Sequence, residues 1–150
     1  MPSHSESRLV QYPATLMYAI VADVERYPEF LPWCAGLRVL SRERIGGRDR
    51  LLAEMLVGFG ALRERYTSRV ALDAVERTVD VTQTDGPFRQ LESHWRIAPD
   101  GEGCRVDFSI AFEFKNALLN AVAGSAFEHA LLKMTDAFEA RAKALSGRSG

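Results

Sequence analysis

Hydrophobic and polar residues alternate along most of the middle of this chain. The alternation is clearest over residues 103–114, where every second residue from Cys104 to Phe114 is apolar and most of the residues between them are polar. A period of two is typical of a β-strand with one buried and one solvated face. The pattern predicts strands at residues 6–12, 36–45, 49–57, 62–72, 77–84, 90–98 and 103–114.

Two other segments have the period of a helix. In the first, apolar residues recur from Leu16 to Val24, Pro13 suits the first helical turn, and the helix should end before Pro28. Residues 27–34 contain two prolines and are expected to form a short helical turn and a loop. The second segment, residues 116–145, should begin at Asn116 as N-cap. Its apolar stripe comprises Leu119, Val122, Phe127, Ala130, Leu131, Met134, Phe138 and Ala142.

The order of these elements predicts an α+β fold. Short links between the six later strands indicate an antiparallel meander. At ~1.5 Å per residue, the last helix would span about 40–45 Å, enough to cross the whole sheet. We expect about seven curved strands to wrap around it, with two short helices after the first strand. Residues 1–150 form one domain in this interpretation, with an ordered core over 6–145 and frayed ends.

Aromatic residues gather in the turns at one end of the meander. Successive turns fall on alternate ends, and one end receives Trp33, Phe59 and Phe88. Apolar turns are unusual because exposed apolar groups reduce solubility. These side chains could form the mouth of a cavity between sheet and helix, or they could fold inward and cap the core.

Composition narrows the function classes. Hydrophobic residues make up 47% of the chain and charged residues 26%, and the net charge is −1, which gives no general electrostatic reason to expect DNA binding. Cys34 and Cys104 are too few for a disulfide framework. The polar N-terminus and the absence of an ~18-residue apolar run favour a bacterial cytoplasmic protein, and a processed organellar protein is the alternative.

Candidate catalytic groups are scarce. No spacing of His, Cys, Asp and Glu matches a metal site. His4 falls in the expected frayed tail, and His94 should face solvent. Cys34 has no neighbouring histidine in sequence, so a buried thiol is the simpler interpretation. Tyr66, Ser68 and Ser93 share the apolar phase of their strands and could orient a ligand or be satisfied within the core.

Arginines recur on the expected outer faces of two strands. The set comprises Arg38, Arg42, Arg44, Arg63, Arg65 and Arg69, with Glu43, Glu54 and Glu64 nearby. A solvated sheet face is the ordinary explanation. An anionic membrane surface or RNA phosphates are the specific alternatives.

Several residue strings resemble one known family. They are residues 27–34 (YPEFLPWC), 57–59 (VGF), 64–70 (ERYTSRV), 86–88 (GPF) with Leu91 and Trp95, 112–114 (FEF), and Met134 with 137–142 (AFEARA). In order and spacing they are similar to the coenzyme Q-binding Coq family of START-like proteins, which includes bacterial ribosome-association toxins of the RatA type. The similarity covers nearly the whole chain.

This resemblance implies a START-like helix-grip fold and non-catalytic binding of ubiquinone (coenzyme Q) or a similar isoprenoid lipid, in support of respiratory electron transport. It implies peripheral contact with the inner membrane or, for the toxin branch, binding to a ribosomal subunit. A cyclase-like enzyme, for which Glu64 with Tyr66 is the candidate pair, is a further alternative. The ligand-binding residues we expect are Phe30, Trp33, Val57, Phe59, Tyr66, Ser68, Phe88, Trp95, Phe112, Phe127, Leu131 and Met134.

Overall fold

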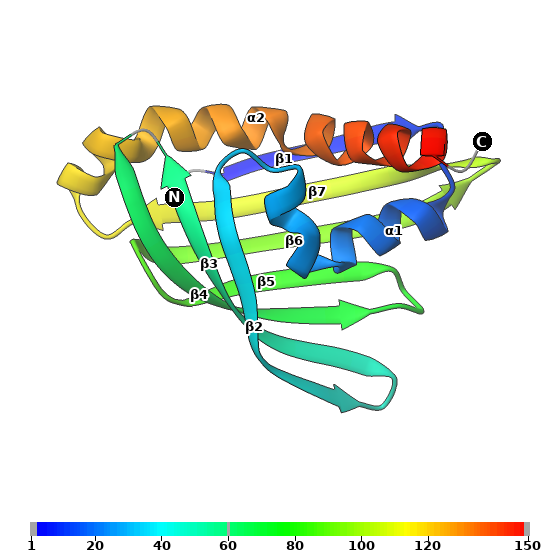
Figure 1. Cartoon of the computed structure of the whole chain (residues 1–150), viewed down its shortest axis with the longest axis horizontal. Coiled ribbons are helices and arrows are strands. Elements are labelled where there is room, and N and C mark those ends of the chain that lie inside the picture. The colour runs from blue at the N-terminus through cyan, green and yellow to red at the C-terminus, as the bar shows by residue number, and fades with distance from the viewer. Residues whose placement is uncertain (1–2, 60, 149–150) are drawn as a thin grey trace.

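The computed structural model, which describes residues 3–59 and 61–148, contains one seven-stranded antiparallel sheet (Figure 1). The strand order is β1-β7-β6-β5-β4-β3-β2. The bounds are β1 (Ser3–Val10), β2 (Cys34–Ile45), β3 (Arg48–Phe59), β4 (Leu62–Asp73), β5 (Thr78–Asp85), β6 (Phe88–Asp100) and β7 (Gly103–Phe114). Consecutive strands from β2 to β7 are neighbours, which confirms the meander, and β1 pairs with β7 at the far edge.

Three helices lie on one side of the curved sheet. The helices α1 (Ala14–Ala22) and α2 (Ala117–Arg148) are α-helical, and η1 (Val24–Glu29), which follows α1 in the chain, is a 3-10 helix. Figure 1 shows α2 running along the sheet, with α1 beside its C-terminal half. This arrangement confirms the helix-grip expectation of a sheet around a long C-terminal helix with two short helices after the first strand.

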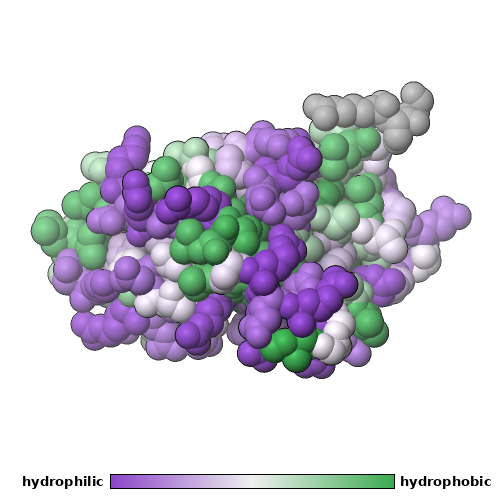
Figure 2. All heavy atoms as spheres, turned by 60° about the horizontal axis from the view of Figure 1, so that its bottom comes forward, coloured by the Kyte–Doolittle hydropathy of each residue, from purple (hydrophilic) through white to green (hydrophobic). Residues whose placement is uncertain are grey.

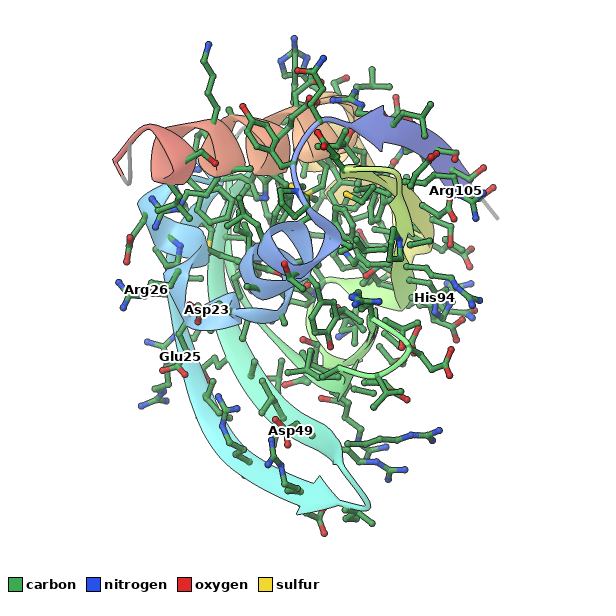
Figure 3. The ribbon with its side chains drawn as sticks, turned by 90° about the vertical axis from the view of Figure 1, so that its right-hand side faces the viewer. Asp23, Glu25, Arg26, Asp49, His94 and Arg105 are labelled. Carbon is green, nitrogen blue, oxygen red and sulfur yellow. The ribbon has the colours of Figure 1, made fainter. Side chains whose placement is uncertain are left out.

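The core fills the space between the sheet and the helices, where apolar side chains from both layers interlock (Figure 3). Its most completely buried side chains include Met17 and Val21 of α1, Val79 and Ile97 of the sheet, and Phe138 of α2. Since one face of each strand contributes to this core, the period-two pattern follows directly from the packing. Among residues 3–59 and 61–148, no helix has the length and hydrophobicity needed to cross a membrane.

Polar contacts fix the position of α2. The Asn116 side chain accepts a hydrogen bond from the Leu119 amide at 2.9 Å, which confirms it as the N-cap. Further along, the buried Thr135 hydroxyl donates to the carboxylate of Glu6 on β1, with oxygen separations of 2.8 and 2.9 Å. The Arg141 guanidinium bonds Glu29 of η1 at 2.8 Å. The helix is therefore tied to the sheet edge and to η1.

Three expectations about these elements were wrong. Strand β1 begins at Ser3, because residues 3–5 pair with the long strand β7 although their polar sequence gives no strand signal. Val24, expected in the first helix, belongs to η1, whereas α1 ends at Ala22, before Pro28 as expected. Val122, expected in the buried stripe of α2, is 39% exposed, and Ala123 is buried in its place.

Candidate functional site

An apolar cavity lies between the concave face of the sheet and α2. Strands β2 to β7 supply its floor, η1 and the following loop supply one side, and α2 covers it. Its volume is about 100 Å³, which is smaller than the ~300 Å³ at the lower end of typical ligand pockets. The side chains therefore leave only a small enclosed space, and a larger ligand requires some of them to move.

Hydroxyl groups provide the polar character of this wall. Tyr66 and Ser68 lie on the wall from β4, and Ser93 lies on it from β6. Burial raises the pKa of Tyr66 to about 12, and the contact with Ser68 partly offsets this rise. The phenol is therefore protonated near neutral pH and can donate a hydrogen bond to a carbonyl oxygen. Such a wall can orient one polar group in an otherwise apolar ligand.

The cavity brings together ten of the twelve residues that the sequence suggested. They are Trp33, Val57, Phe59, Tyr66, Ser68, Phe88, Trp95, Phe127, Leu131 and Met134. Phe112 lies outside the wall because the ring of Phe127 covers it, with ring centroids 4.5 Å apart. Phe30 packs against Phe138 at 5.2 Å and faces an outer groove instead.

The sequence interpretation missed about half of the wall. The missed residues are Val24, Tyr27, Leu31, Leu37, Ala53, Met55, Val70, Val81, Leu91, Phe108, Ile110 and Phe138, whereas Ser93 was already a candidate for orienting a ligand. Met55, Val70 and Ile110 are each two positions from a predicted residue, so the alternation of the strands could have identified them. Tyr27 and Leu31 could not be found in this way, because their placement depends on how η1 folds over the sheet.

The aromatic residues at the end of the meander fold inward. Phe59 is 6% exposed and Phe88 is 2% exposed, and both rings contact Phe127, at 5.1 and 5.0 Å between centroids. Of the three residues expected at a mouth, Trp33 alone is half-buried. For Phe59 and Phe88 the core-capping interpretation is therefore correct, although both still line the cavity.

The other candidate groups lie apart from the cavity or are unreactive within it. Glu64 is exposed and does not line the wall, so it cannot pair with Tyr66 in the cavity. His94 faces away from the interior, as expected, and its Nδ1 lies 2.7 Å from Asp80 (Figure 3). His4 belongs to β1 and not to a frayed tail. Burial raises the pKa of the Cys34 thiol to about 11, which disfavours the nucleophilic thiolate.

The arginine set divides between the two faces of the sheet. Arg65 and Arg69 lie on the outer face of β4, and Arg38 faces outward on β2, where it pairs with Glu54 at 3.1 Å. A bulge between Val39 and Ser41 then reverses the phase of β2. As a result, Arg42 turns toward the helix side, where it meets Glu25 of η1 at 3.3 Å.

Arg44 follows Arg42 in phase and bonds Asp49 at 2.8 Å. The expectation that Arg42 and Arg44 share the outer face was therefore wrong. The view from the side away from α2 shows a mostly hydrophilic surface broken by separate hydrophobic patches (Figure 2). The outer basic cluster that remains, Arg38, Arg63, Arg65 and Arg69, lies on β2 and β4.

Comparisons with known proteins agree with this architecture. Residues 10–139 match the family described as polyketide cyclase / dehydrase and lipid transport. The ribosome association toxin RatA of Pseudomonas aeruginosa is 36% identical over 149 residues, covering 98% of this chain and all of the relative. The mitochondrial coenzyme Q-binding protein COQ10 homolog B of Xenopus laevis is also 36% identical over 149 residues, covering 97% of this chain and 59% of that protein.

A solved START superfamily protein from Mycobacterium smegmatis superimposes with a TM-score of 0.76. It covers 95% of this chain and 98% of its own length at 22% identity. This likeness shows the START fold and no more.

Proposed function

The chain belongs to the polyketide cyclase / dehydrase and lipid transport family, and we propose that it binds an isoprenoid quinone or a similar apolar lipid without transforming it. The observation that carries this proposal is the apolar cavity with a hydroxyl group pair, Tyr66 and Ser68, on its wall. The quinone ring would lie against the strands, and Tyr66 would donate a hydrogen bond to one of its carbonyl oxygens. The name of the COQ10 relative supports the ligand class.

The test is the identification of lipid carried by the protein from a quinone-producing bacterial host. Native mass spectrometry followed by organic extraction should find about one quinone per chain. A Met134→Lys variant introduces a charge into the cavity wall and should lose the quinone. Leu132→Lys is the matched control, because Leu132 is 61% exposed on the opposite side of the helix. Wild-type protein that is empty and refuses added quinone would rule the proposal out.

A cyclase-like activity has weaker support. The described residues of the cavity wall include no carboxylate, histidine, lysine or arginine, and acid–base catalysis usually depends on such groups. The phenol of Tyr27 donates to the Val21 carbonyl oxygen, and burial raises its pKa, so this group is held as a structural donor. The family description is the main reason to keep cyclase chemistry as an alternative.

A second candidate function is binding to a ribosomal subunit. It is favoured by the outer basic cluster and by the name of the RatA relative. Arginines on the outer face of the curved sheet can contact the phosphates of ribosomal RNA, and such binding weakens steeply with salt. The cavity has no direct part in this function. Quinone binding would therefore depend on the cavity, and ribosome binding on the outer basic cluster.

Charge reversal on the two faces separates these candidates. Arg65→Glu with Arg69→Glu should abolish cosedimentation with ribosomal subunits and leave quinone binding intact. Arg42→Glu with Arg44→Glu is the matched control, because it changes the charge equally on the other face. Both pairs are exposed, so the loss of their ion pairs should change stability little. Unaltered cosedimentation of the first variant would argue against this surface.

The proposed ligand resides in membranes, so we also propose peripheral contact of a cytoplasmic protein with the inner membrane. The support is the N-terminal part of α2, where residues 117–127 carry no charge. In this part Leu118 is 72% exposed. It lies at the same end of the molecule as the rings of Phe59 and Phe88.

A further inference from the structure

An outer groove runs between α2 and the loop that follows η1. Phe30, Pro32 and Trp33 form one wall, and small side chains of α2, among them Ala137 and Ala140, form the other. The volume of this groove is about 600 Å³, against about 100 Å³ for the inner cavity. Its ionisable side chains, His129, Lys133 and Asp136, all come from α2.

The groove and the cavity share a wall. Trp33 and Phe59 line both spaces, so these two rings are the partition between them. The two rings are held differently. Phe59 packs edge-on against Phe127 at 5.1 Å and is 6% exposed. Trp33 is half-buried, and within the part of the chain that the structure describes no aromatic ring stacks on it.

The backbone at Trp33 is nevertheless fixed. The Trp33 carbonyl oxygen accepts a hydrogen bond from the Gly58 amide at 2.9 Å, and the Cys34 amide donates to Leu31 at 3.0 Å. The side chain can therefore change rotamer while its loop stays in place. Rotation of this one indole would join the inner cavity to the outer groove.

We propose that Trp33 is the movable partition of a lateral portal, and that the outer groove holds the apolar tail of a ligand whose polar ring occupies the inner cavity. This inference rests on the proposed function. The otherwise apolar inner wall has hydroxyl groups that can bond one polar ring, whereas the groove is walled mostly by aromatic and alanine side chains, with His129, Lys133 and Asp136 on its α2 side. A ligand with a compact polar ring and an elongated apolar tail matches this division, and the small inner cavity cannot contain both parts.

The test compares two quinones with the same dimethoxy-methyl ring, one without a tail and one with a ten-carbon tail. Each methylene buried in the groove is worth up to about fourfold in affinity. Since ordering costs reduce this gain, we expect the tailed quinone to bind at least about tenfold more tightly. Calorimetric titration of the full chain measures both affinities.

Variants that fill the groove test where the tail lies. Ala137→Phe should remove the advantage of the tailed quinone and leave the affinity for the tailless one unchanged. Ala140→Phe should likewise reduce the advantage of the tailed quinone. Because Ala140 is exposed, this second variant should fold even if Ala137→Phe does not. Ala121→Phe is the control, because Ala121 is exposed on the same helix and does not line the groove.

The outcomes separate the two proposals. If the tailed quinone loses its advantage in both groove variants and keeps it in Ala121→Phe, the tail lies in the groove, as passage beside Trp33 requires. If wild type binds both quinones equally, or the groove variants retain the tail's advantage, the groove assignment is overturned and the proposed function stands. If neither quinone binds to wild type, the proposed function fails, and the portal fails with it.

Discussion

At the scale of single residues, close contacts explain why position 86, in the turn between β5 and β6, is a glycine. A Cβ at this position would lie 2.5 Å from Oε1 of Gln83 and 2.7 Å from Cβ of Tyr66. The Gln83 amide group in turn clamps the backbone of Phe88 through two hydrogen bonds, of 2.6 and 3.2 Å. The turn therefore passes directly over the cavity wall, with no room for a side chain.

Gly86→Ala should lower the free energy of unfolding by about 1–3 kcal/mol, because the turn must move away from Tyr66 and Gln83. Urea denaturation followed by circular dichroism measures this change. Gly36→Ala is the control, since its Cβ would lie 3.4 Å from the flexible end of Leu56 and should have little effect. Equal stability of the two variants would contradict the close approach at Gly86.

The raised pKa of Tyr66 predicts a loss of stability at alkaline pH. The pKa is about 12 in the folded state because of burial, against about 10 for an exposed tyrosine. Below pH 10 both states keep the proton, and this contribution to stability is fully present. As the pH rises from about 10 toward 12, the unfolded state releases its proton first, so stability falls.

The Tyr66→Phe variant should lose less stability than wild type between pH 10 and 11, by about 1 kcal/mol. Urea unfolding at pH 8, 10 and 11 provides the comparison. Burial also raises the pKa of Tyr18 to about 12, so part of the alkaline loss should persist in the variant. Identical pH dependence of the variant and wild type would show that Tyr66 does not titrate in this way.

At the scale of elements, the sequence predicted the strands and the long helix well because each has a buried face. A regular spacing of apolar residues identifies such a face even when the element that packs against it is unknown. It could not reveal the bulge between Val39 and Ser41, because one extra residue reverses the phase without changing the composition. It also missed residues 3–5 of β1, whose pairing with β7 is made by the backbone.

A mutation can test how much the contact between β1 and α2 contributes to stability. Thr135 is 3% exposed, and its hydroxyl bonds a carboxylate that Arg8 also approaches at 2.8 Å. Thr135→Val keeps the shape but removes the donor, so we expect a loss of about 1–3 kcal/mol in the free energy of unfolding.

A double-mutant cycle with Glu6→Ala distinguishes a direct bond from general packing. If the hydroxyl and the carboxylate interact, the double variant should lose less than the sum of the two single losses. Additive losses would indicate that the contact contributes no interaction energy of its own. The measurement is urea denaturation at neutral pH for wild type, both single variants and the double variant.

At the scale of the whole molecule, the short links between strands were enough to predict the topology of the sheet. The length of the last helix was enough to predict that the sheet wraps around it. The size of the cavity could not be predicted in this way. Phe127 illustrates why: its ring covers Phe112 and contacts Phe59, Phe88 and Phe114. Which of several aromatic rings fills a core and which leaves a space depends on packing in three dimensions.

The end of the molecule that carries the first turns of α2 gives a prediction about membranes. Leu118 and Val122 are exposed on the uncharged first turns of α2, and Lys115 and Arg89 lie beside them, with an Arg89 nitrogen 3.3 Å from the Lys115 carbonyl oxygen. Exposed apolar side chains next to cations suit the interface of an anionic bilayer, where the side chains insert and the cations meet phosphate. The protein should therefore sediment with vesicles that contain anionic lipid.

Leu118→Asp with Val122→Asp should reduce this sedimentation at least about tenfold, because it replaces inserting side chains by charges that the bilayer repels. Leu9→Asp with Val75→Asp is the matched control, since both residues are more than two-thirds exposed and lie outside α2. Vesicles of neutral lipid should bind wild type more weakly. If the α2 variant binds as well as the control, contact must occur through another surface, and the tip of α2 would have no part in delivering a ligand to the groove.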